Sequence, residues 1–456
     1  MRKNYKKQMP LTITSIDHPH AEELEGTSQI LDANPIIYEW VLQDLTRSVT
    51  HVDTGAEGMS AEQVLRAAII KQMEGYSYED LAFHLLDSVC YRSFCRIGIA
   101  DKGFQKSALC NNIKAISSQT WEAINRLLVA YGQDKEIEKG KEVRTDCTVV
   151  SSNIHEPTDS GLLWDSVRVL TRKLGQINER FDDLDIPFSD HTKRAKRRML
   201  GIMNAKSAKA RKKKYIDLLK VTHKTANYAC KAVSMLEAFH FKHSCLVETA
   251  QGVAEELKAI IHLTHRVIEQ TTRRVIHGES VPASEKIVSI FEPHTDIIVK
   301  DRRDTFYGHK ICLSNGASNL ITDCLILDGN PADTELTDQM LDRHKEIYGR
   351  YPVKVALDGG FASKENLNSA KSKGIKDVCF AKKRGLEQEE MCRSSWVYKR
   401  LRRFRAGIES AISWLKRCFG LYRCTWKSLP SFHSYVWASI VSANLLTLAR
   451  SELGLS

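Results

Sequence analysis

The sequence predicts an α/β protein whose core is a mixed β-sheet flanked by helices, with an all-α domain before it and a large helical insertion within it. Apolar residues follow helical spacing through 60–97, residues 143–150 form a β-branched segment, and short strands alternate with helices after residue 286. Such alternation is typical of a sheet covered by helices. The chain has 456 residues, 42% apolar and 27% charged, which excludes a small disulfide-stapled peptide and a wholly disordered chain.

The charge balance favours a nucleic acid as the partner. Lys and Arg exceed Asp and Glu by 67 − 56 = 11, an excess that suits a polyanion. The longest apolar stretch, 436–449, is interrupted by Ser, Asn and Thr and is too short to span a bilayer. The 12 cysteines contain no C-x-x-C pair and are expected to be reduced thiols. We therefore expect a cytoplasmic protein with no membrane partner.

The N-terminal part is predicted to be a tail over 1–35 and a helical DNA-binding domain over 36–138. Gly75 interrupts the helical pattern, and Ser77 is expected to cap the helix that follows. Residues 103–109 are a candidate start for a recognition helix, a pattern that is also common in helical cores that bind nothing.

Later segments predict a split α/β domain. Residues 139–165 and 287–450 are assigned to it, and residues 166–286 to a basic helical insertion. The expected strands cover 143–150, 297–299, 309–313, 320–327, 353–357 and 378–380. The expected helices of the second part cover 336–348, 364–373, 402–417 and 432–448.

Two aspartates occupy notable places on these strands. Asp146 lies inside a Val/Thr-rich strand, where aspartate is disfavoured. Asp358 directly follows the strand 353–357, at the carboxyl end where α/β sheets bind ligands. An edge-strand residue facing water and a turn aspartate are the structural alternatives, and neither position decides the matter alone.

Glu409 is the only acidic residue between Met391 and Ser451, and ten basic residues surround it between Arg393 and Lys427. On a helix, Arg405 is its neighbour at i−4 and Lys416 lies two turns along the same face. An ordinary helix salt bridge is one explanation. The other is a carboxylate that holds a metal ion while flanking cations bind phosphates.

If Asp146, Asp358 and Glu409 converge, their charges need compensation. Two carboxylates 4 Å apart repel by about 4 kcal/mol at an effective dielectric constant near 20. Mg²⁺ is the natural counter-ion, because it prefers carboxylate, water and phosphate oxygens. A pair of Mg²⁺ ions then activates the attacking hydroxyl and stabilises the leaving oxygen at phosphorus. The predicted chemistry is phosphodiester cleavage or transfer.

At these positions the sequence resembles the DDE-type insertion-sequence transposases of the retroviral-integrase/RNase H superfamily. Residues 59–98 are similar to their helical N-terminal domain, and Asp146-Cys-Thr-Val-Val to their first catalytic strand. Leu357-Asp-Gly-Gly-Phe361 matches the second aspartate block. The spacing of Arg405, Glu409 and Lys416 matches the C-terminal Arg/Glu/Lys signature, and Asn444-Leu-Leu fits the usual ending.

The resemblance implies an RNase H-like catalytic core in which Asp146, Asp358 and Glu409 bind two Mg²⁺ ions, with Mn²⁺ as a substitute. It implies double-stranded DNA as the partner, both the terminal inverted repeats of the element and the target DNA. It also implies a homodimer in a synaptic complex. The expected location is the cytoplasm of a prokaryote, in association with the nucleoid. Arg405 and Lys416 become phosphate contacts. Arg402, which stands where many members have a tyrosine, joins them as a cation, and Cys147 is expected to lie beside the metal.

The insertion carries a basic run, with eleven Lys or Arg and no Asp or Glu between His191 and Lys214. A solvated helix face is the alternative to a DNA-backbone surface. The predicted phosphate contacts are Lys193, Arg194, Lys196, Arg197, Arg198, Arg211, Lys212, Lys213 and Lys214.

The resulting hypothesis is a transposase that cleaves element ends and transfers the freed 3′-hydroxyl into target DNA. The alternatives are an RNase H-like nuclease without joining activity and a non-catalytic, architectural DNA-binding protein. A smaller expectation concerns Asp333, which is predicted to cap the helix that follows it.

Overall fold

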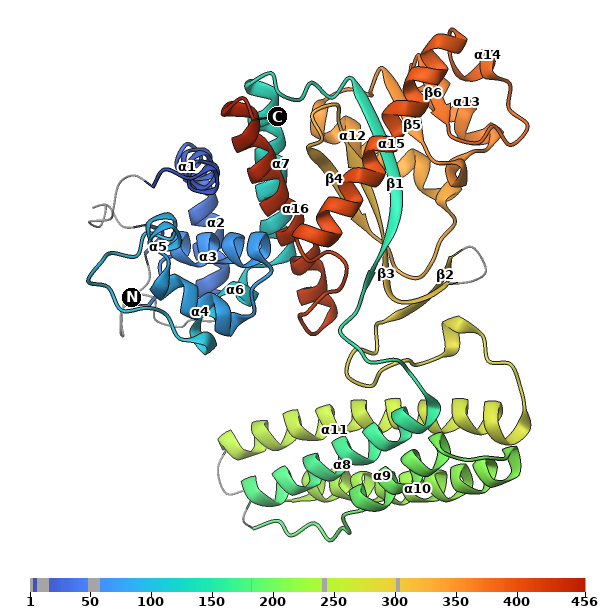
Figure 1. Cartoon of the computed structure of the whole chain (residues 1–456). Coiled ribbons are helices and arrows are strands. Elements are labelled where there is room, and N and C mark those ends of the chain that lie inside the picture. The colour runs from blue at the N-terminus through green and yellow to red at the C-terminus, as the bar shows by residue number, and fades with distance from the viewer. Residues whose placement is uncertain are drawn as a thin grey trace. The chain divides into compact units, whose positions relative to one another are not determined.

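The computed structural model describes residues 3–5, 16–47, 58–181, 183–239, 244–300 and 304–455. Two compact units make up the chain: Met1–Ser152 with His309–Ser456, and Asn153–Gly308. In Figure 1 the first unit contains the blue N-terminal helices and the orange and red C-terminal elements, and the second contains the green helices.

The first unit opens with helices whose ends are fixed by local capping. Ser60 and Gln63 form a capping box at the start of α3, and Ser77 and Asp80 form another at the start of α4, as predicted for Ser77. Gly75, with φ of +67°, ends α3 in the left-handed region. The N-terminal helices are α1 (Pro19–Asp32), α2 (Ile36–Thr46), α3 (Ala61–Glu74), α4 (Tyr78–Asp87), α5 (Val89–Phe94), α6 (Lys106–Ala115) and α7 (Ser118–Asp134).

Helix α1 corrects the prediction of a tail over 1–35. Leu24, Ile30 and Leu31 are buried, and α1 packs against α16 (Leu429–Glu452), a helix from the other end of the chain. A local sequence window contains no sign of this distant partner, so the helix was missed. Residues 6–15 of the predicted tail lie outside the described residues.

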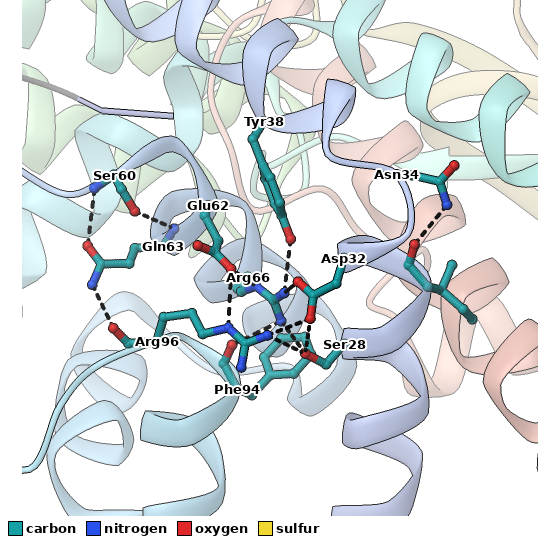
Figure 2. Close-up of polar contacts among 11 residues, drawn as sticks. Ser28, Asp32, Asn34, Tyr38, Ser60, Glu62, Gln63, Arg66, Phe94 and Arg96 are labelled. Atoms are coloured by element: carbon teal, nitrogen blue, oxygen red, sulfur yellow. Dashed lines mark hydrogen bonds and ion pairs between the residues drawn. The ribbon is translucent and has the colours of Figure 1, made fainter. Parts of the chain in front are cut away.

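An ion network around the buried Arg66 ties α1 to α3, with the exposed Asp32 as its acid on α1 (Figure 2). Arg66 of α3 is fully buried; its Nη2 donates to Asp32 at 2.6 Å and its Nε to Glu62 at 3.0 Å. Arg66 also donates to the hydroxyl of Tyr38. Arg96, in the segment after α5 (Val89–Phe94), contacts the carboxylates of both Asp32 and Glu62. Since every donor of a buried guanidinium needs a partner, this network fixes how the helices pack.

A mixed sheet forms the centre of the first unit: β3, β1, β5 and β6 lie side by side in that order, and β4 pairs with β3. The parallel pairs are β1 with β5 and β5 with β6, while β4 is antiparallel to β3. The strands are β1 (Glu142–Ser151), β3 (Asp304–Asn315), β4 (Ile321–Ile326), β5 (Lys354–Leu357) and β6 (Asp377–Phe380). Buried Val, Ile, Leu and Cys side chains form the strand interiors.

Helices flank the sheet, which confirms the predicted mixed sheet with flanking helices (Figure 1). They are α12 (Thr337–Tyr348), α13 (Lys364–Ser372), α14 (Gln388–Met391), α15 (Ser395–Cys418) and α16. Helix α15 packs on β1, β5 and β6, while α16 contacts β4 and also α1, α3 and α7. One hydrophobic core therefore contains residues of the N-terminal helices, the sheet and α16.

His344 of α12 makes the stability of this unit dependent on pH. Its Nε2–H donates to the carbonyl of Gly140 at 3.1 Å, and its buried Nδ1 has no hydrogen-bond partner among the described residues. Burial lowers its pKa to about 4, whereas an unfolded histidine titrates near 6.5. The folded state therefore binds fewer protons than the unfolded state between these two values.

We expect stability to be full above pH 6.5 and to fall as the pH drops toward 4, by up to about 3 kcal/mol for this group. Thermal unfolding of the wild type and His344→Gln over this window tests the expectation. The variant is expected to lose part of the pH dependence, and the exposed control His223→Gln is expected to retain it. Equal pH profiles for His344→Gln and the wild type would contradict this assignment.

The second unit is a bundle of α8 (Asp159–Arg180), α9 (Thr192–Met203), α10 (Ala208–Ala238) and α11 (Ser244–Thr271). Leu170, Leu174 and Leu257 belong to one of its two apolar clusters. Its strand β2 (Asp296–Lys300) pairs antiparallel with the first residues of β3. None of the helices in the described ranges has the length and apolar character needed to cross a membrane.

Candidate active site

Three acidic residues come from separate elements of the first unit. Asp146 lies on β1, Asp358 directly follows β5, and Glu409 lies on α15. Strands β1 and β5 are parallel, and their last paired residues are Thr145 and Leu357. Asp146 and Asp358 are the next residues along these two strands, so the sheet itself brings them to the same level.

The three carboxylates meet at one guanidinium. Nη1 of Arg405 lies 3.8 Å from Oδ2 of Asp146 and 3.3 Å from Oδ1 of Asp358. Nη2 of the same side chain donates to Oε1 of Glu409. The Arg405 side chain is 15% exposed, whereas those of Asp358 and Glu409 are 41% and 59% exposed. The mostly buried Arg405 therefore anchors the cluster, while the carboxylates of Asp358 and Glu409 are open to solvent.

Arg405 supplies the charge that such a cluster requires. Burial lowers its pKa, but the hydrogen bond to Glu409 and the charges of Asp358 and Asp146 outweigh burial, so the net shift is upward. With the guanidinium between them, no three His, Cys, Asp or Glu side chains of the described residues are grouped closely enough to hold a metal ion. The cation shared by the three acids in this conformation belongs to the protein.

Arg144 positions α15 over the sheet. It lies two residues before Asp146 on β1, so both side chains leave the same face of the strand. Its Nη1 donates to the carbonyl of Phe404 at 2.6 Å and its Nε to Oδ1 of Asn315 at 2.5 Å. Its guanidinium also lies 4.6 Å from the centre of the Phe404 ring. Arg405 follows Phe404 directly, so this anchor places the Arg405 side chain beside Asp146.

Gly407 makes the anchor possible, because a Cβ at this position would overlap with the guanidinium of Arg144. We expect Gly407→Ala to displace Arg144 or α15 and to slow the strand cleavage that the family resemblance implies by about 100-fold, the effect of a misplacement near 1 Å. Gly252→Ala on α11 is the matched control, since its Cβ would meet nothing within 4 Å. Alanine favours the helix, so this control is expected to be neutral or slightly stabilising. Normal cleavage by Gly407→Ala would show that the anchor is dispensable.

The two glycines after Asp358 lie against further charged residues that sequence reasoning missed. A Cβ on Gly359 would be 2.8 Å from the Cβ of Lys382, and one on Gly360 would collide with Asp333. Lys382 begins the run Lys382-Lys383-Arg384 just after β6, so its position after a strand parallel to β5 was the available signal. This loop puts cations next to the turn that carries Asp358.

Asp333 does not cap a helix, contrary to the prediction. The helical turn that begins at Asp333 has Ala332 as its N-cap. The Asp333 carboxylate instead lies 2.6 Å from Nζ of Lys310, a nearly buried residue of β3. A lysine buried on a strand needs an acidic partner, and this requirement outweighs capping.

Cys147 does not lie beside the three acids, contrary to expectation. Side chains alternate along a strand, so Cys147 points away from the face of Asp146 and joins a buried cluster with Cys312. A hydrogen bond with Cys312 and burial raise the pKa of the Cys147 thiol. Both cysteines are free thiols, and this neutral pair belongs to the core.

Arg402 and Lys416 extend the basic side of α15 around the acids. Arg402 is exposed and one turn before Arg405, while Lys416 is half-buried and two turns after Glu409. At 1.5 Å per residue, Arg402 and Lys416 are about 21 Å apart along the helix. Along α15, Glu409 therefore lies between Arg402 on one side and Lys416 on the other.

In the second unit, the basic run of the insertion divides into paired and solvent-facing cations. Arg194 and Arg198 of α9 both bind Asp217 of α10, an acid just beyond the run. Lys212 and Lys214 donate to the backbone carbonyls of Ile276 and Gly201. The sequence suggested a basic face with no acid to balance its charge. In the structure, Asp217 neutralises part of that charge. Besides Arg194 and Lys212, the exposed cations of the run are Lys193, Lys196, Arg197, Lys206, Lys209, Arg211 and Lys213.

Comparison with known families gives two matches. The family model described as "Transposase DDE domain" matches residues 297–445, and the one described as "Transposase domain (DUF772)" matches residues 16–115. The first match contains Asp358, Arg405 and Glu409, whereas Asp146 precedes it. No curated protein and no solved structure matches the chain.

Proposed function

The chain belongs to the DDE transposases of insertion sequences, and on that premise we propose that it cleaves DNA at the ends of its element and joins the freed 3′-hydroxyl to target DNA. The observation that supports this proposal most directly is the shared contact of Asp146, Asp358 and Glu409 with Arg405. Three acids from two parallel strands and a helix meet at the carboxyl edge of the sheet, where an RNase H-like core would perform phosphoryl transfer.

The chemistry of the three acids suits Mg²⁺, which would take the place that Arg405 holds between them. Asp146, Asp358 and Glu409 would hold it through hard oxygen ligands, and two of the three carboxylates are open enough to accept hydrated ions. The guanidinium of Arg405, which contacts all three acids, is a stand-in cation and supports a site for positive charge here. When bound, Mg²⁺ polarises the phosphodiester and lowers the pKa of the attacking hydroxyl, and Mn²⁺ would serve similarly.

The surrounding cations hold the DNA backbone. Arg402, Arg405 and Lys416 bind phosphate oxygens along α15, and Lys382 binds a phosphate beside Asp358. These contacts keep the reacting phosphodiester in line with the attacking oxygen, which supplies much of the catalysis when little covalent chemistry falls to the protein. Each contact is to the backbone, so none of them reads the sequence.

Sequence reading at the element ends is assigned to α6 of the N-terminal helices. Its N-cap Gln105 and its residues Lys106, Ser107 and Asn111 are exposed and bear groups that hydrogen-bond base edges. Leu109 and Ile113 bury the opposite side. Two element ends must react together, so the working form is a homodimer.

The deciding experiment incubates the purified chain with duplexes that carry the flanking inverted repeats and with a target plasmid. Cut ends with 3′-hydroxyls and joined products are expected in Mg²⁺ or Mn²⁺, and neither in EDTA. Cutting without joining would identify the nuclease alternative. Equal DNA binding with and without metal, and no cut product, would identify a non-catalytic DNA-binding protein.

A variant of Arg405 tests the metal site without an activity assay. Arg405→Gln removes the cation that three acids share, so the acids repel one another in EDTA. We expect added Mg²⁺ to raise the melting temperature of this variant by several degrees more than that of the wild type. The matched control is Arg400→Gln, on the same helix and paired with Glu142. Equal Mg²⁺ effects in all three proteins would argue against a metal site here.

A further inference from the structure

Helix α10 displays a long basic stripe that extends well beyond the basic run of the sequence. Five lysines recur at spacings of four, seven, four and seven residues, which keeps them on one side of an α-helix. All five are exposed, and we call them the α10 stripe: Lys209, Lys213, Lys220, Lys224 and Lys231. The other residues on this side are Ile216, His223 and Asn227, all exposed and none acidic.

The acids of α10 do not neutralise the stripe. Asp217 is bound by Arg194 and Arg198 of α9, and Glu237 is bound by Lys258 of α11. Within the described ranges, no stripe lysine has an ion pair with an acid. Like charges at i and i+4 destabilise an isolated helix, so the stripe is a cost to the bundle unless an external anion compensates it.

The dimensions of the stripe fit a DNA duplex. Lys209 and Lys231 are 22 residues apart, which is about 33 Å along a helix at 1.5 Å per residue. One turn of B-DNA is about 34–36 Å. A straight row of cations of this length matches the phosphates along one turn of a rigid duplex, whereas a flexible single strand offers no such fixed spacing.

From these observations we infer that the α10 stripe is a docking surface for the backbone of duplex DNA, independent of its sequence. The inference rests on the proposed function for the presence of DNA, but it adds Lys220, Lys224 and Lys231, which lie outside the basic run of the sequence. The stripe holds the duplex by charge and sets its direction along α10. It contributes to affinity and salt dependence, and the catalytic acids take no part in it.

The test measures binding of the full-length chain to a fluorescent 30-base-pair duplex of arbitrary sequence, in EDTA, by anisotropy at several salt concentrations. The variant Lys213→Gln/Lys220→Gln/Lys224→Gln removes three stripe charges. Its matched control, Lys139→Gln/Lys173→Gln/Lys258→Gln, removes three lysine charges that are paired with glutamates. Both variants lower the net charge equally, so only the location of the charge differs.

We expect the slope of log K against log salt to become shallower by roughly 2–3 in the stripe variant, at about 0.9 per lost phosphate contact, and to remain nearly unchanged in the control. A single strand of equal length is expected to show a smaller change. An unchanged slope in the stripe variant, an equal change in the control, or an equal loss for single-stranded DNA would overturn the inference. Because EDTA blocks cleavage, an inactive catalytic site leaves this measurement unaffected.

Discussion

Asp146→Asn, Asp358→Asn and Glu409→Gln are each expected to reduce strand cleavage by about 1,000-fold, which corresponds to about 4 kcal/mol of transition-state stabilisation. Each amide keeps the shape of the side chain but removes a negative charge that the proposed metal ions would need. The Arg405 contacts place all three acids at one point, so we expect similar losses for all three. Cleavage of a labelled element-end duplex in Mg²⁺, timed under single-turnover conditions, measures the effect.

Glu365→Gln is the matched control for these variants, since Glu365 is an exposed acid on α13 of the same unit. It is expected to cleave at the wild-type rate. Circular dichroism and DNA binding in EDTA should be unchanged in all four variants, because the three acids are not part of the hydrophobic core. A folded variant of any one of the three acids with near-normal cleavage would remove that acid from the proposed site.

Arg66→Met is expected to destabilise the N-terminal helices by about 3–5 kcal/mol, the effect of breaking a buried ion pair. Arg66 is fully buried, and methionine would leave Glu62, 7% exposed, without its closest cation (Figure 2). The hydroxyl of Tyr38 would also lose its donor. Since the chain has more than one folded unit, hydrogen exchange of the α3 amides is a better measure than a single melting temperature.

Lys106→Met is the control for Arg66, because Lys106 pairs with Glu79 at 2.9 Å and both side chains are exposed, 63% and 78%. Exposed pairs contribute little, so a change within about 0.5 kcal/mol is expected. If the α3 amides exchange their hydrogens equally slowly in the two variants, the network does not hold these helices together.

Much of the first unit could be predicted because its signals are local. The strand that carries Asp146, the strand that ends before Asp358 and the basic helix around Glu409 each have a periodic pattern of their own. The fold class followed from their alternation. The isolation of Glu409 among cations indicated the third acid, and the structure places it in contact with the same guanidinium as the other two.

Other features depend on contacts between distant segments and have no local signal. The anchor from Arg144 to α15 joins residues 260 positions apart, and only the folded chain shows why Gly407 lacks a side chain. Asp217 lies beyond the basic run, so a count of charges within that run could not reveal that it neutralises Arg194 and Arg198. Helix α1 was missed for a similar reason, since its apolar residues pack on α16.

The position of α16 determines when the N-terminal helices can finish folding during synthesis. Leu429, where α16 begins, follows Asp134, where α7 ends, by 295 residues. At about 5–20 residues per second, a ribosome needs roughly 15–60 s to cover that distance. Through that interval the nascent chain exposes the apolar surface of α1, α3 and α7 that α16 covers in the folded structure. A polypeptide terminated before Leu429 would thus keep this apolar surface exposed to solvent, which ties the folding of the N-terminal helices to the synthesis of α16.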